Sequence, residues 1–222
     1  MLLWQKPLLL VLPAVLAACA SSQQSLPFAP AAAERGIQIV RALPEALPSH
    51  LSKVPETQYL LVFAGSTALA LLDNLNPLPI SITDPIAGAY QDQEAGRLKG
   101  RYASVDPFVI ATERMQGSPL LTGRADALRT MPLVYMVEDS DDNFRPTLVL
   151  RAEDGGWMGR YLYHMPRAYA ISQVKAAAPE MLAGLRRELQ QGADVLRGLM
   201  ERDARGTLKG DGRRVAYGSY HI

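Results

Sequence analysis

The sequence predicts an α+β fold in which an antiparallel sheet is packed by one long helix. Three observations lead to this prediction. Strand-like runs separated by polar turns fill residues 132–165, an amphipathic pattern with helical spacing fills residues 172–205, and a last hairpin-like stretch follows it. Residues 35–222 are enough for one well-buried core and too few for two, so we expect a single domain there.

The antiparallel sheet is expected from three runs, "MPLVYMVED", "RPTLVLRAED" and "GWMGRYLYHM". The polar stretch "SDDNF" separates the first two, and Asp154-Gly155-Gly156 separates the last two. An Asp-Gly pair between strand-like segments is a strong hairpin signal, so the three runs predict a meander.

The long helix is expected because apolar residues recur at steps of three and four along residues 172–205. Pro179 suits its first turn and Gly206 the position just beyond its end. Gly184, Gly192 and Gly198 inside the pattern each weaken a helix by about 1 kcal/mol relative to alanine, and close packing against another surface is one reason that could explain them. Beyond the helix, "TLKGDGRRVAYGSY" predicts a final hairpin that turns at residues 210–212.

Earlier segments give weaker signals. "IQIVRAL", from Ile37, predicts a short strand, and residues 59–63 predict a strand that is buried on both faces. A helix is expected over residues 67–72. The run "DPFVIATERM", residues 106–115, is interpreted as a strand before a Gly-Ser-Pro turn.

The N-terminus has the pattern of a signal peptide, because no polar side chain interrupts the run from Pro7 to Ala18. A membrane-spanning helix needs about 20 apolar residues, and this run is shorter and contains Pro7 and Pro13. We therefore expect residues 1–18 to be removed. Lys6 is the only charged side chain among them, so 22 cationic and 22 acidic residues remain. This balance gives no reason to expect nucleic-acid binding.

Leu16-Ala17-Ala18-Cys19 resembles the lipobox of bacterial lipoproteins. The resemblance implies that Cys19 becomes the first residue of the mature chain and carries a diacylglyceryl thioether and an acylated amine, with palmitate-like chains as the membrane anchor. Ala20, rather than Asp, at the next position resembles an outer-membrane address facing the periplasm. The alternative is an ordinary secreted protein. Cys19 is the only cysteine, and residues 19–34 are interpreted as the lipidated cysteine and a flexible tether.

Ser66 is the one candidate nucleophile. Ala64 and Ala68 in "AGSTA" are small enough for the tight turn of a nucleophile elbow. A serine hydrolase also needs a base, and the later histidines are His164, on a predicted strand, and His221, beside the C-terminus. The favoured interpretation is that Ser66 caps a helix.

Metal sites are not expected. Asp139, Asp141 and Asn143 have the spacing of the first three ligands of a calcium loop, but Phe144 replaces the glycine bend and Leu150 the bidentate Glu. His50, His164 and His221 are far apart in the sequence.

Trp157, Tyr161 and Tyr163 share one face of the third meander strand and are candidates for stacking on a small apolar or sugar ligand. The favoured alternative is that this face is covered by the long helix.

These patterns favour a non-catalytic, lipid-anchored cell-envelope protein that holds a partner or supports an envelope assembly, with no cofactor. A small-ligand or glycan-binding module that uses the three aromatic residues is the alternative. A Ser66-dependent hydrolase comes third.

Overall fold

The computed structural model describes residues 28, 30–42, 51–62, 92–139, 142–154 and 157–208. In chain order the elements are α1 (Pro30–Arg35), β1 (Ile37–Ile39), β2 (Ser52–Lys53), β3 (Tyr59–Val62), the 3-10 helix η1 (Ala103–Val105), α4 (Pro107–Met115), β4 (Leu128–Glu138), β5 (Asn143–Asp154), β6 (Trp157–His164), β7 (Tyr169–Ala170), α5 (Ile171–Ala176) and α6 (Pro179–Ala204). The predicted C-terminal hairpin and the predicted helix at residues 67–72 lie outside these residues.

The α+β prediction is confirmed. β4, β5 and β6 form the expected antiparallel meander, in which Val134 lies opposite Leu148 and Leu148 opposite Tyr163. The sheet is mixed, because β1 and β3 both run parallel to β4 along the same edge. β1 lies beside the start of β4 and β3 beside its second half, while β2 adds an antiparallel edge to β3.

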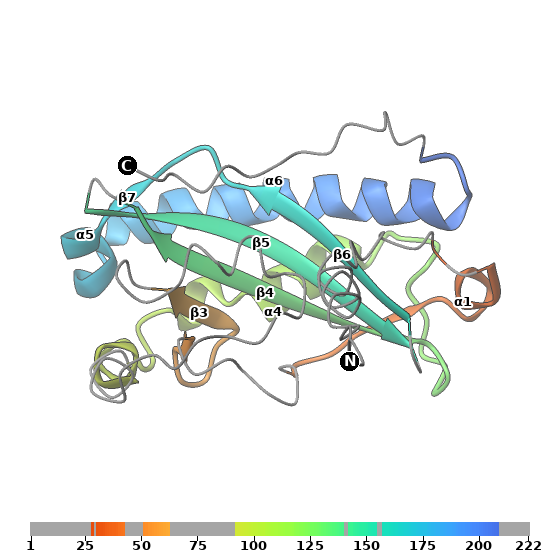
Figure 1. Cartoon of the computed structure of the whole chain (residues 1–222), viewed down its shortest axis with the longest axis horizontal. Coiled ribbons are helices and arrows are strands. Elements are labelled where there is room, and N and C mark those ends of the chain that lie inside the picture. Colours follow the sequence, from red (N-terminus) through yellow and green to blue (C-terminus); the bar gives the residue numbers. More distant parts are fainter. Residues whose placement is uncertain are drawn as a thin grey trace, which may run out of the picture.

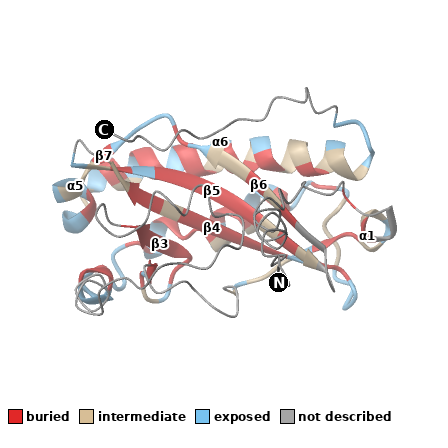
Figure 2. Ribbon diagram, viewed as in Figure 1, coloured by how far each residue is buried: buried red, intermediate tan, exposed pale blue. Residues whose placement is uncertain are grey.

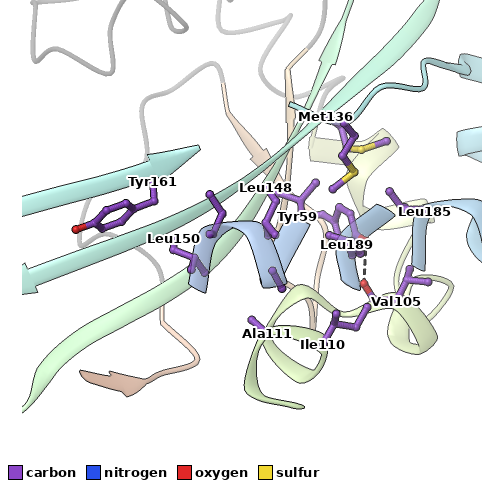
Figure 3. Close-up of a cluster of buried hydrophobic side chains, with 14 of the residues drawn as sticks. Tyr59, Val105, Ile110, Ala111, Met136, Leu148, Leu150, Tyr161, Leu185 and Leu189 are labelled. Atoms are coloured by element: carbon purple, nitrogen blue, oxygen red, sulfur yellow. Dashed lines mark hydrogen bonds between the residues drawn. The ribbon is translucent and has the colours of Figure 1, made fainter. Parts of the chain in front are cut away.

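α6 and α4 lie side by side behind the sheet in the view of Figure 1. α6 packs on β5 and β6, and α4 packs on β4. Between the helices and the sheet lies the main core, where Leu185 and Leu189 of α6 and Ile110 of α4 meet the β5 residues Leu148 and Leu150 (Figure 3). Figure 2 shows that this side of α6 is buried and the other side is exposed or partly exposed.

Two tyrosines connect the edge of the sheet to the helical layer. The Tyr59 hydroxyl donates a hydrogen bond to the Val105 carbonyl at 2.8 Å (Figure 3), and the Tyr102 hydroxyl donates to the Val174 carbonyl at 2.9 Å. Their rings meet edge to face with centroids 5.0 Å apart. Each hydroxyl therefore satisfies a backbone carbonyl within the core, which a buried polar group requires.

The strand expected at residues 106–115 is wrong, because Pro107–Met115 form α4. Asp106 caps the helix by accepting from the backbone N–H of Phe108, and Pro107 occupies the first turn. The buried residues Ile110, Ala111 and Met115 follow helical spacing. Asp106-Pro107 is a local signal for the start of a helix, but the β-branched residues that follow it favour a strand.

The prediction of a long helix is confirmed. The predicted range contains two helices, the short α5 and the 26-residue α6. Ala177 has a left-handed φ of 49° and ends α5, and Pro179 then begins α6. Gly206, with φ 65°, follows the end of α6. A Cβ at Gly184 would lie 3.2 Å from the Tyr169 hydroxyl, and one at Gly192 would lie 2.6 Å from the Tyr163 ring. Gly198 has open space around it.

These two environments predict opposite effects of the same substitution. Gly198→Ala is expected to raise the free energy of unfolding by up to about 1 kcal/mol, because it removes only the helix cost of glycine. Gly192→Ala is expected to lower it, because the new methyl group would overlap the Tyr163 ring. Urea unfolding of both variants checks this. Stabilisation by Gly192→Ala would contradict the packing described here.

Candidate functional site

Several predicted site residues lie outside the described part of the chain. These are Cys19, Ser66, His50, His221 and Asp141. The lipidation and hydrolase predictions therefore remain predictions.

Two of the three aromatic candidates lie beneath α6. Tyr161 is 8% exposed, and its hydroxyl donates a hydrogen bond to Asp203 Oδ2 at 2.6 Å. Burial, followed by this bond, raises the pKa of Tyr161. Tyr163 lies against Gly192. The backbone of Trp157 pairs with Asp154, and its side chain is not among those described. Tyr161 and Tyr163 thus occupy the face that α6 covers.

The acidic turn after β4 is stabilised from within. Asp139 accepts a hydrogen bond from the backbone N–H of Asn143 at 3.2 Å and from Arg145 Nε at 2.7 Å. Asp142 takes a left-handed φ of 55°, a conformation that Asp tolerates better than most residues. Among the described residues, no three His, Cys, Asp or Glu side chains gather as metal ligands would. Asp139 acts here as a turn residue.

His164 lies on the opposite face of the sheet from Tyr161 and Tyr163. Its Nδ1 is 2.9 Å from Thr147 Oγ1, across the β5–β6 pair. Partial burial lowers the pKa of this imidazole.

Two buried carboxylates next to the helical layer were not found from the sequence. Glu94 accepts from Lys175 Nζ of α5 at 2.7 Å and from Arg97, and the hydrogen bond to Lys175 is the main reason why the pKa of Glu94 is lowered. Asp106, the cap of α4, lies 2.6 Å from Arg41 Nη1, whose guanidinium stacks over Phe108 at 4.6 Å. Both carboxylates join segments that are distant in the sequence.

A third buried carboxylate is incompletely paired. Glu188 of α6 is 6% exposed, and its Oε1 lies 3.1 Å from Arg167 Nε. Its Oε2 and the nearby Tyr169 hydroxyl are both buried and make no hydrogen bond of good geometry, but the two side chains are close enough for each to act on the pKa of the other. Burial is the main reason why the pKa of Glu188 is raised. The sequence does indicate this burial, because Glu188 comes three positions after Leu185 and next to Leu189, which places it on the apolar face of the helix.

The raised pKa of Glu188 sets the sign of a pH effect. Between the ordinary Glu pKa of 4.5 and the raised folded value, the folded protein binds this proton more strongly than the unfolded chain. The contribution of Glu188 to stability therefore increases as the pH falls from neutral through that window.

Glu188→Gln is expected to remove this pH dependence, because glutamine does not titrate. Melting temperatures measured between pH 7.5 and pH 4.5 check this, with Glu113→Gln, at an exposed position of α4, as the matched control. An unchanged pH slope in Glu188→Gln would show that Glu188 titrates normally in the folded protein.

No helix in the described ranges is long and apolar enough to cross a membrane. Comparison with known proteins found no matching family model, no similar curated protein and no similar solved structure.

Proposed function

We propose that this protein is a non-catalytic lipoprotein of the bacterial cell envelope, anchored by an acylated Cys19, whose α+β domain holds a partner close to the outer membrane on its periplasmic side. The observation that carries the proposal is the lipobox-like Leu16-Ala17-Ala18-Cys19 sequence at the end of an uninterrupted apolar run. Two or more acyl chains, at about 0.8 kcal/mol per buried methylene, make release from a bilayer rare.

The start of the folded core limits the reach of the anchor. Phe28 is 5% exposed and packs in the main core, and α1 begins at Pro30. Both lie within the range that the sequence analysis assigned to the tether, so the connection to Cys19 is shorter than residues 19–34. Residues 20–27, at about 3.3 Å each, span at most about 30 Å including both junctions. An anchor of this length keeps the domain next to the bilayer.

Several buried polar groups that could have served chemistry are engaged in holding elements together: Glu94 binds Lys175, Asp106 binds Arg41, and Tyr102 binds the Val174 carbonyl. α1 and α5 lie at opposite ends of the long axis (Figure 1). The α5 end is therefore the part of the domain that lies farther from the point where the anchor enters the core.

The anchor is tested by Cys19→Ser in the full-length protein. We expect the variant to leave the membrane fraction, because no acyl chain can be attached. Ser21→Ala is the matched control and is expected to stay with the membrane. Cell fractionation with immunoblotting measures both. Retention of Cys19→Ser in the membrane at the level of the control would refute the lipobox interpretation.

The binding role is tested by affinity purification of the lipidated protein from gently solubilised envelopes, read by mass spectrometry. We expect an envelope protein to co-purify with the wild-type chain and to be depleted with Cys19→Ser, which no longer reaches the same surface. Absence of such a partner, together with labelling of Ser66 by a fluorophosphonate probe, would replace this proposal with the hydrolase alternative.

A further inference from the structure

The strand β6 forms one edge of the sheet. It has eight residues, and among the described residues it pairs with β5 alone (Figure 1). Apart from this pairing, residues 157–163 make no backbone hydrogen bond within the described part of the chain. Alternate residues of a strand direct their N–H and C=O groups to opposite sides. Half of the backbone groups of β6 therefore point away from β5 and are available to a further strand.

The opposite edge of the same sheet is protected by means that proteins commonly use. Its outermost described strands, β1 and β2, have only three and two residues, and β2 ends at the exposed Lys53. Very short edge strands and charged side chains, lysine above all, prevent another chain from pairing there. β6 is longer and contains no proline. A long edge strand of this kind is a template for a further strand.

The helix α6 has two flanks, and one of them runs beside β6. Asp194 binds Arg114 of α4, so the flank that carries Asp194 faces α4. Glu188 binds Arg167, which follows β6, so the flank that carries Glu188 faces the β6 side. Val195 comes seven positions after Glu188, which is about two helical turns. Val195 therefore lies on this second flank, which we call the β6 flank.

Apolar side chains reach the surface along the β6 flank. Val195 is 43% exposed, and Leu199, about one turn further along α6, is half-buried. Tyr163 of β6 contacts Gly192 of α6 and is also half-buried. A strand that paired with β6 would direct every second side chain towards this flank. Apolar side chains at those positions would cover Val195 and Leu199.

Cationic side chains surround the same edge. Arg160 of β6 is half-buried on the other face of the strand, where a side chain of a docked strand would lie beside it. Arg167, whose side chain is 60% exposed, and the exposed Arg202 lie towards the two ends of the β6 flank. Glu188 and Asp203 of α6 already accept bonds from side chains of this domain. Acidic side chains on a docked strand would complement this charge.

We propose that β6 pairs with an extended segment of a partner protein, which adds one strand to the sheet and alternates apolar and acidic side chains. The apolar side chains cover Val195 and Leu199, and the acidic ones lie beside Arg160. Main-chain hydrogen bonds supply affinity in this mode of recognition, and the alternate side chains supply specificity. This inference rests on the proposed function, the holding of a partner, and names the surface that holds it.

The test uses the full-length lipidated protein in non-ionic detergent and a fluorescent peptide with capped ends, as long as β6, in which valine and glutamate alternate. Two further peptides carry N-methyl groups, one on its valine amides and the other on its glutamate amides. Fluorescence anisotropy measures binding. Because only one set of amides faces β6, we expect the parent peptide and one methylated peptide to bind saturably. No saturable binding of the parent peptide, or equal binding of all three, would overturn the proposal.

Val195→Glu is compared with Val109→Glu, at a 42% exposed position of α4. Loss of the apolar contact is expected to weaken binding of the parent peptide about tenfold or more in Val195→Glu, and Val109→Glu is expected to bind as the wild type does. Equal binding by both variants would overturn the proposal. A dimer in the same detergent that Val195→Glu dissociates would also overturn it, because a second copy of this chain would then occupy the edge.

The titration can fail independently of the proposed function, because it needs neither a membrane nor the natural partner. If an envelope protein co-purifies but the peptide does not bind, the partner is held elsewhere on the domain and only this inference is wrong. If Cys19→Ser stays in the membrane fraction but the peptide binds in a manner that depends on Val195, the anchor is wrong and the binding surface stands.

Discussion

The packing of α6 on the meander is the interaction on which the rest of the structure depends. Leu185, Leu189 and Leu196 of this helix are almost completely buried against β5, β6 and α4. Burying one leucine side chain contributes about 1.5–3 kcal/mol, so this stripe is a major part of the hydrophobic stabilisation of the domain. The sheet cannot bury its strongly apolar helix-facing side without α6.

The same packing positions α4 and the edge strands. Arg114 of α4 binds Asp194 of α6 with two hydrogen bonds, and Arg197 donates to the Arg114 carbonyl at 2.7 Å. These contacts lie at the surface, where ion pairs contribute little to stability, so their role is to fix the position of one helix relative to the other. Once α4 is in place, η1 presents the Val105 carbonyl to Tyr59 of β3. This buried hydroxyl is one of the contacts that bind the edge of the sheet to the helical layer.

Local patterns predicted the elements that have a strong period or a clear turn. The meander followed from alternating strand runs with polar turns, and α6 from apolar residues at helical spacing between Pro179 and Gly206. The helix α4 was missed because Phe108, Val109 and Ile110 favour strands, whereas its Asp-Pro start and its place between α6 and β4 favour a helix. The parallel pairing of β1 and β3 with β4 depends on contacts between distant segments, which no local pattern contains.

Among the candidate site residues, too, local patterns in the sequence predicted some features and missed those that depend on contacts between distant segments. The aromatic residues of β6 were found from alternation, which correctly placed Tyr161 and Tyr163 on one face, and the structure places both beneath α6. On the opposite face, Arg151 of β5 and Arg160 of β6 become neighbours only through the register of the two strands, which no local pattern contains. Glu188 had a visible signal, a charge within an apolar stripe, but its unpaired oxygen depends on the position of Arg167 after β6.

The proposed role of this protein depends on the attachment of the domain to a membrane through Cys19. The most direct measurement is mass spectrometry of the N-terminal peptide of the mature protein isolated from its envelope. We expect a chain that begins at Cys19, with a diacylglyceryl group on the sulfur and an acyl group on the amine. An unmodified cysteine, or a mature chain that begins at another residue, would contradict it.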